Sequence, residues 1–205
     1  MKKFDLQFLN ETHKTLAGVD EAGRGPLAGP VVAAAVVFPN NFYLPEINDS
    51  KKLSEIKRNY LFDIIKNNSL AFGIGIVSHT EIDKINILQA SLKAMKIAVS
   101  KLKITPDIIL IDGNKSFHSN LKIKTIVKGD SKSFSIAAAS ILAKVTRDKI
   151  MEKASDYFPQ YEWKSNKGYP TKRHREILKE IGPSPLHRKT FLKKILINKI
   201  DLKLF

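Results

Sequence analysis

Two adjacent carboxylates, Asp20 and Glu21, lead into a glycine-flanked arginine, Arg24, within residues 18–26 (GVDEAGRGP). Carboxylate oxygens are hard ligands that suit Mg²⁺ or Mn²⁺. The planar guanidinium group of arginine suits phosphate, and glycines let the backbone approach a ligand closely. An acidic turn on a solvated surface is the alternative for a lone Asp-Glu pair, but the flanking residues favour a metal site beside a phosphodiester.

Two further carboxylates, Asp112 and Asp130, each follow an apolar segment rich in β-branched residues. The carboxyl ends of strands are where α/β sheets commonly hold ligands. Each residue also has a structural alternative, because Asp112 with Gly113 could form a turn and Asp130 could cap the next helix. Together with Asp20 and Glu21, they make the four carboxylates that two divalent ions need to activate water and stabilise a leaving oxygen.

A dinucleotide-binding motif is a competing interpretation of the glycines. Gly23, Gly25 and Ala28 satisfy the spacing G-x-G-x-x-G/A. That motif opens a helix, whereas two prolines interrupt residues 26–30 and an apolar run typical of a buried strand follows at 31–38. We therefore expect the glycines to form a turn between two strands.

Hydrophobic periodicity and capping residues predict the elements that position these side chains. Strands are expected at 15–19, 31–38, 70–77, 107–111 and 121–127. Helices are expected from the N-cap Ser54 to about 67, from the capping box at Ser78 to about 101, and over 135–154, 172–180 and 188–197. Strands and helices mix without strict alternation, which predicts an α/β fold with a mixed sheet flanked by helices. We expect a catalytic core over 1–155 and a small C-terminal helical appendage over 156–205, packed on or near the core.

Composition favours a polyanionic partner. The 205 residues carry a net charge of +15, from 35 Lys and Arg against 20 Asp and Glu, although a lysine-rich composition alone could produce this. The lack of cysteine excludes disulfides and thiolate zinc sites, and the five histidines show no metal-binding spacing. With no signal-peptide pattern and no apolar run long enough to span a bilayer, we expect no membrane association and a cytoplasmic location.

Five segments resemble bacterial ribonuclease HII, in the order of that family: residues 18–26, 49–53 (DSKKL), 111–113 (IDG), 128–132 (KGDSK) and 138–148 (AASILAKVTRD). The resemblance covers about residues 15–187. It implies a ribonuclease H-like fold with a five-stranded sheet. It also implies endonucleolytic cutting of RNA within RNA–DNA hybrids, including single ribonucleotides in duplex DNA. Ribonuclease HIII fits less well, because the Gly-Arg-Gly triplet is present and no extra N-terminal domain precedes it.

The resemblance also implies roles for individual residues. It assigns Asp20, Glu21, Asp112 and Asp130 as ligands of two catalytic Mg²⁺ or Mn²⁺ ions, where bound water attacks phosphorus. The products would carry a 5′-phosphate and a 3′-hydroxyl, with the nick on the 5′ side of the ribonucleotide.

Substrate recognition is implied for a second set of residues. Gly23, Arg24 and Gly25 match the triplet that detects the ribose 2′-hydroxyl, the group that distinguishes RNA from DNA at such a site. Tyr169, in residues 167–170 (KGYP), matches the tyrosine that packs against the adjoining deoxyribose. An ordinary half-buried aromatic is its alternative.

The remaining candidates are open between two interpretations each. Lys51 and Lys52 could hold phosphates or be solvated lysines at a helix entry. Ser140 and Lys144 lie one helical turn apart and could face nucleic acid, or the small residues around them could serve close packing. For Asp148, far along a helix, we expect a structural role.

The last five residues, 201–205 (DLKLF), resemble the peptide Gln-Leu-Ser/Asp-Leu-Phe by which bacterial replication proteins bind the sliding clamp, although the first and third positions depart from it. Their two leucines and phenylalanine could fill an apolar groove or pack on the last helix of the chain.

Two alternatives to a ribonuclease remain open at this point. One is a non-catalytic basic nucleic-acid-binding module whose carboxylates are structural. The other is a nuclease of the same fold that acts on plain DNA.

Overall fold

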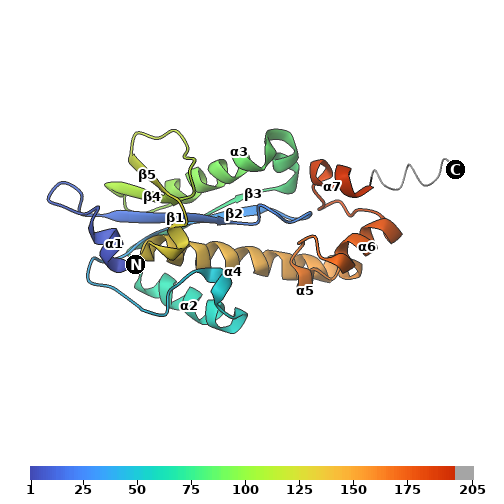
Figure 1. Cartoon of the computed structure of the whole chain (residues 1–205), viewed down its shortest axis with the longest axis horizontal. Helices are drawn as coiled ribbons and strands as arrows, with labels where there is room; N and C mark the ends of the chain where they lie inside the picture. Colours follow the sequence, from blue (N-terminus) through green and yellow to red (C-terminus); the bar gives the residue numbers. More distant parts are fainter. Residues whose placement is uncertain (197–205) are drawn as a thin grey trace.

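A computed structural model describes residues 1–196, and its centre is a five-stranded sheet in the order β3-β2-β1-β4-β5 (Figure 1). The strands are β1 (Leu16–Ala22), β2 (Val31–Val37), β3 (Ala71–Val77), β4 (Ile108–Asp112) and β5 (Lys122–Ile126). Antiparallel pairing joins the first three, and β4 pairs in parallel with both β1 and β5. The predicted mixed five-stranded sheet is confirmed.

Helices cover both faces of this sheet (Figure 1). One face carries α3 (His79–Ser100), and the other carries α2 (Glu55–Asn68) and α4 (Phe134–Tyr157). Every residue of β2 is buried, because its side chains contact helices on both faces. This two-sided burial explains the continuous apolar sequence of β2.

The start of α4 lies directly against β1. Gly18 permits this approach, because a Cβ atom built there would lie 2.1 Å from the carbonyl carbon of Ser135. Ser133 caps the helix by accepting a hydrogen bond from the N–H of Ile136 at 3.2 Å. The alternative in which Asp130 caps this helix is therefore wrong. The helix also continues to Tyr157, three residues beyond its expected end.

Ser54 and Ser78 cap α2 and α3 as predicted. Two features were not predicted: the short helix α1 (Lys2–Leu6) and a kink within α3 at Asn86, whose φ is 66°. The Asn86 side chain accepts hydrogen bonds from the two N–H groups that begin the next turn, so it acts as a second N-cap inside α3. In residues 1–196, none of the helices is both long and apolar enough to cross a membrane.

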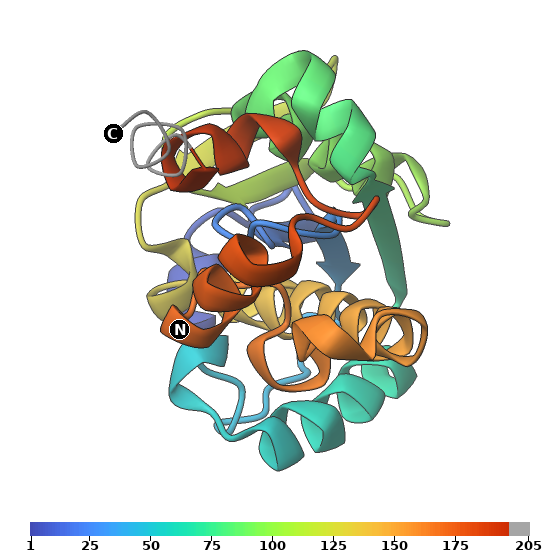
Figure 2. The same ribbon diagram turned by 90° about the vertical axis from the view of Figure 1, so that its right-hand side faces the viewer.

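Four short helices follow α4 and pack at one end of the sheet, where Figure 2 shows α6 and α7 in front. They are η3 (Pro159–Tyr161), α5 (Trp163–Asn166), α6 (Lys172–Ile181) and α7 (Lys189–Leu196). Their cluster includes Leu27 and Ala28 from the loop between β1 and β2. An isolated β-bridge also joins Ala28 to His187. The C-terminal region is therefore packed on the loop that follows the Asp-Glu pair.

Two buried histidines connect this region internally. His187 accepts a hydrogen bond at Nδ1 from the N–H of Ser184 (2.9 Å), so its Nε2 carries the proton and donates to Nε2 of His174 (3.1 Å). His174 in turn donates from Nδ1 to the carbonyl of Tyr169 at 2.9 Å and accepts from the indole of Trp163 at 3.3 Å. The partners therefore assign both rings as neutral.

These neutral histidines predict a pH-dependent stability. Burial lowers the pKa of His187 from its ordinary value to about 4, and His174 adds to the effect. Between about pH 6.5 and pH 4 the unfolded chain binds a proton that the folded chain excludes, so the free energy of unfolding falls as the pH falls, by at most about 3 kcal/mol for this group.

The test is urea unfolding of the wild type and His187→Asn across this pH range. The amide oxygen of the substituted side chain retains an acceptor for Ser184 but cannot titrate. We expect the variant to be less stable at neutral pH and to lose less stability on acidification. An identical loss in both proteins would contradict the assignment.

Candidate active site

Asp20 and Glu21 lie on β1, just beyond the point where its pairing with the neighbouring strand β4 stops. Pairing between β1 and β4 stops at Val19 with Ile111, and β4 ends at Asp112. Beside β2, however, β1 continues to Ala22, so it ends three residues beyond the end of the expected strand 15–19. This leaves an opening at the β4 side of the sheet.

The two carboxylates of the pair approach this opening from opposite faces of β1. Asp20 faces α4, where it accepts a hydrogen bond from Ser140. Glu21 faces α3 and lines a small hollow there with Ser91. Both also line one cavity with Asp112, because no strand separates them beyond the end of β4.

This cavity, of about 270 Å³, brings together most of the predicted site residues. It is lined by Asp20, Glu21, Ala22, Gly23, Arg24, Gly25, Ser50, Lys51, Asp112, Ser140, Lys144 and Tyr169. The fourth carboxylate, Asp130, does not line the cavity, but it forms an ion pair with Lys51, whose Nζ lies 3.3 Å from Asp130 Oδ2. Lys52 is exposed and does not line the cavity.

Negative charge is crowded and poorly hydrated here. Asp20 is only 5% exposed, and burial raises its pKa well above the ordinary value, with Glu21 and Asp112 adding repulsion. Burial also raises the pKa of Glu21 and the pKa of Asp112. A site that raises the pKa of several carboxyl groups together stabilises any positive ligand that neutralises them.

Local donors and cations hold the carboxylates apart. Asp112 Oδ1 accepts a hydrogen bond of 2.6 Å from the N–H of Gly129, which fixes β4 to the turn that carries Asp130. Arg24 Nη1 lies 3.2 Å from Glu21 Oε1. Arg24 and Lys51 thus each neutralise one carboxylate in this state.

The donor set fits a divalent metal. All four carboxylates offer hard oxygen atoms, and like-charge crowding favours a cation between them. Within residues 1–196, no three acidic or histidine side chains converge as ready metal ligands. Glu21 and Asp130 form ion pairs with Arg24 and Lys51 instead. Asp20, Glu21, Asp112 and Asp130 remain the predicted ligands.

The Gly-Arg-Gly turn rests on a buried arginine. Gly23 has a φ of +101°, and a Cβ atom built there would lie 2.3 Å from Arg147 Nε, so a side chain would need both a rare backbone conformation and space that is already filled. Arg147 also lies 5.4 Å from the centre of the Tyr169 ring, and the ammonium group of Lys144 lies 5.3 Å from it. Tyr169 is thereby held against the turn by two cations.

Ser140 and Lys144 share one face of α4 but have different partners. Ser140 hydrogen-bonds with Ser50 at 2.9 Å as well as with Asp20, so it supports the carboxylate cluster directly. Lys144 faces the cavity but donates to Asp148 at 2.8 Å. Asp148 is buried, which agrees with the structural role expected for it.

Sequence reasoning missed three residues around the turn: Ser50, Arg147 and Arg188. Ser50 stands beside the lysines that were singled out, and Arg147 stands within a segment that carries the family resemblance. Nothing in the local pattern marked Arg188, because its contacts are with residues more than 150 positions away.

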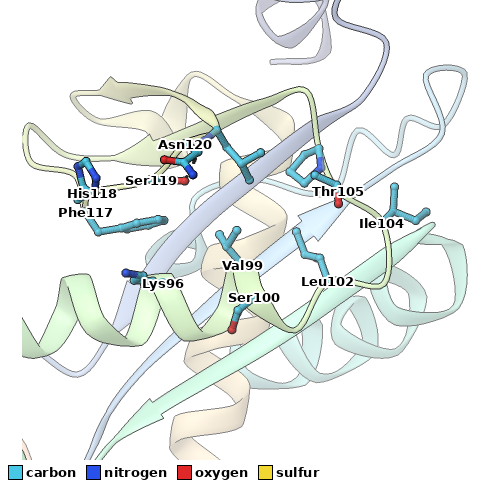
Figure 3. A pocket seen from close by; sticks show the side chains of 12 residues that line it. Lys96, Val99, Ser100, Leu102, Ile104, Thr105, Phe117, His118, Ser119 and Asn120 are labelled. Atoms are coloured by element: carbon cyan, nitrogen blue, oxygen red, sulfur yellow. Dashed lines mark hydrogen bonds between the residues drawn. The ribbon is translucent and has the colours of Figure 1, made fainter.

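A larger hollow, of about 630 Å³, lies between the end of α3 and the loop before β5 (Figure 3). Val99 and Ser100 line it from α3, and Ser119 and Asn120 line it from the loop. None of the residues around it is acidic, so it offers none of the carboxylate chemistry described above.

The mixed sheet and the carboxylates at its open edge define the class of ribonuclease H-like hydrolases. A family model described as ribonuclease HII matches residues 17–194. The chain therefore belongs to the ribonuclease HII family and not to the ribonuclease HIII family.

Individual relatives agree with this. The chain is 54% identical to the ribonuclease HII of Caldanaerobacter subterraneus subsp. tengcongensis over 196 residues, covering 96% of this chain and 81% of that protein. It is similar to the solved ribonuclease H2 of Pyrococcus horikoshii, with a TM-score of 0.74, 28% identity, and 90% and 98% of the two chains covered. The ribonuclease HII of Archaeoglobus fulgidus, solved in complex with PCNA, gives a TM-score of 0.70, 26% identity, and coverage of 85% and 94%.

Repulsion between the crowded carboxylates should lower the free energy of unfolding when no metal is bound. Asp20→Asn removes one buried negative charge, so we expect the metal-free variant to melt about 2–4 °C higher, the shift that about 1 kcal/mol produces at this size. Thermal unfolding in the presence of a chelator measures it.

Asp107→Asn is the matched control for this measurement. Hydrogen bonds from Thr15 lower the pKa of Asp107, which is exposed, so its charge is favourable and its removal should not stabilise. A melting temperature for Asp20→Asn below that of the wild type would show that the buried charge does not destabilise the folded protein.

Proposed function

We propose that this ribonuclease H hydrolyses the RNA strand of RNA–DNA hybrids and nicks duplex DNA on the 5′ side of single ribonucleotides, leaving 5′-phosphate and 3′-hydroxyl ends. One observation carries the proposal. Asp20, Glu21 and Asp112 line the same cavity as the turn 23–25 and Tyr169. Groups suited to hydrolysis therefore lie beside groups suited to reading a ribose.

Enzymes of this family depend on divalent metal ions. For this chain we propose Mg²⁺ or Mn²⁺, with two ions in the substrate complex held by Asp20, Glu21, Asp112 and Asp130. When bound, such ions lower the pKa of water and neutralise charge on the leaving oxygen.

The side chains of the chain itself bind and orient the substrate. Arg24 is more than half exposed and presents a fork that can turn from Glu21 to a phosphate, which frees that carboxylate for a metal. Lys51, with 80% of its side chain exposed, can leave Asp130 in the same way. Lys144 lines the cavity beside Tyr169, where its charge favours the phosphate backbone.

The two alternatives are weaker on the same observations. A binding module gains nothing from buried carboxylates that repel one another and would repel phosphates too. A nuclease for plain DNA does not need a glycine turn and an aromatic ring beside the carboxylates.

The decisive assay uses a labelled DNA duplex with one ribonucleotide, an all-DNA duplex, and Mg²⁺ or Mn²⁺. We expect a nick in the first duplex only, and a loss of at least about 10²-fold in rate for Asp112→Asn, because a charged group at the reacting centre is removed. Mass spectrometry of the products identifies the ends.

Other outcomes select the alternatives. If both duplexes bind and neither is cut, the chain is a binding module. If both are cut at equal rates, the turn 23–25 does not read the ribose.

A sliding clamp is the second proposed partner. The ribonuclease HII of Archaeoglobus fulgidus was solved in complex with PCNA. In this chain the candidate peptide, 201–205, lies outside the described residues. Nucleic acid and the clamp are both cytoplasmic in a bacterium, so the cytoplasm is the proposed compartment.

Deletion of Leu204 and Phe205 tests the clamp proposal. We expect it to weaken binding to the clamp of the same organism at least about tenfold, because two apolar anchors are lost, while cleavage of a short duplex is unchanged. Isothermal calorimetry measures the affinity. Equal affinity of both proteins, or none in either, would reject the peptide.

A further inference from the structure

Arg188 is a fully buried arginine that binds main-chain carbonyl groups beneath the turn 23–25. Its Nη2 donates to the carbonyl of Gly23 at 2.7 Å and its Nη1 to the carbonyl of Arg24 at 3.1 Å. The same guanidinium group donates to the carbonyls of Gly29 (3.0 Å) and Pro30 (3.1 Å). One side chain thus fixes the direction of successive peptide groups in the turn.

Peptide geometry then determines what the turn offers on its other side. In a planar trans peptide the C=O and the following N–H point in opposite directions. Because the carbonyls of Gly23 and Arg24 point inward to Arg188, the N–H groups of Arg24 and Gly25 point outward. Neither N–H donates to an acceptor within residues 1–196. A Cβ atom built on Gly25 would meet nothing within 4 Å, so the space in front of the turn is open.

The C-terminal region holds Arg188 in this position. The N–H of Arg188 donates to the carbonyl of Leu27 at 2.8 Å, and the carbonyl of Leu186 accepts from the N–H of Gly29 at 3.0 Å. The Phe191 ring covers the guanidinium group at 5.1 Å. Contacts made by Leu186, Arg188 and Phe191 therefore hold the Arg188 side chain in place beneath the turn.

We propose that Arg188 is a positioning residue for ribose recognition, because it holds the Gly23 and Arg24 carbonyls inward and thereby presents the N–H groups of Arg24 and Gly25 to the 2′-hydroxyl of the substrate. This inference rests on the proposed function. It extends that function to a residue that is fully buried and does not line the cavity.

The fork shape of the guanidinium group is what the role requires. Arginine presents donors in a rigid plane, and here three nitrogen atoms reach four carbonyl oxygens. Burial and the neighbouring Arg147 lower the pKa of Arg188 to about 9, so the side chain is still charged at neutral pH. Lysine would keep the charge but cannot reach the carbonyls of both Gly23 and Arg24 in the same geometry.

The experiment measures binding, without chemistry, in the presence of a chelator. Fluorescence anisotropy gives the affinity for a duplex with one ribonucleotide and for the same duplex in DNA. For wild type we expect the ribonucleotide to strengthen binding about tenfold, the contribution of about one well-made hydrogen bond. The ratio of the two affinities, with ribonucleotide over all-DNA, measures ribose recognition. For Arg188→Lys we expect this affinity ratio to fall to within about twofold of unity, with the affinity for the all-DNA duplex nearly unchanged.

Asp5→Ala is the control for general destabilisation. Asp5 is buried and accepts hydrogen bonds from the N–H and hydroxyl of Ser135 at the start of α4, away from the turn. This variant should melt at a lower temperature and keep the wild-type ratio. Should Arg188→Lys fail to fold, Arg188→Ala in millimolar guanidinium replaces it, and the added ion should restore the ratio in a concentration-dependent way.

The outcomes separate the inference from the function on which it rests. A wild-type ratio near unity would overturn both, because the turn would read no hydroxyl. A preserved wild-type ratio in Arg188→Lys, or in Arg188→Ala without guanidinium, would overturn the positioning role alone. Loss of the ratio together with an equal loss of all-DNA affinity would also overturn it, since that pattern indicates a collapsed surface.

Discussion

Like charges held together at the open edge of a sheet are the constraint on which this structure depends. Asp20 and Asp112 are carried by neighbouring parallel strands, and β4 ends where β1 continues, so both carboxylates meet in one cavity. The repulsion is tolerated because the sheet is covered on both faces and the start of α4 is fixed against Gly18. The rigid core therefore supports an arrangement that the carboxylates alone would not adopt.

The second half of the site depends on contacts between distant parts of the chain. Residues 186–188 lie antiparallel to residues 27–29, and two buried arginines from different helical regions bind carbonyl groups of the loop after β1. The C-terminal region, outwardly an appendage, thus shapes the turn that faces the cavity. In the proposed function, hydrolysis and ribose recognition are joined because the same strand, β1, leads from the carboxylates into that turn.

Much of this could be predicted from the sequence, and the reasons differ by element. Buried strands such as 31–38 and the serine caps of α2 and α3 follow from local rules, and the Asp-Glu pair was recognisable because of the glycines and arginine beside it. The extension of β1 to Ala22 and the contacts of Arg188 could not be predicted, since each depends on tertiary partners. The kink at Asn86 was not predicted either, because it interrupts a helical pattern that continues on both sides. The alternative of Asp130 as a helix cap failed because Ser133, three residues later, has the better geometry.

We propose that the carboxylates and the turn 23–25 act on the same nucleotide. A crystal structure of the Asp112→Asn variant bound to a duplex with one ribonucleotide tests it most directly. We expect the 2′-hydroxyl against the N–H groups of the turn, and the phosphate on the 5′ side of that ribonucleotide beside Asp20. A ribonucleotide bound away from the turn, or a scissile phosphate outside the cavity, would contradict the account.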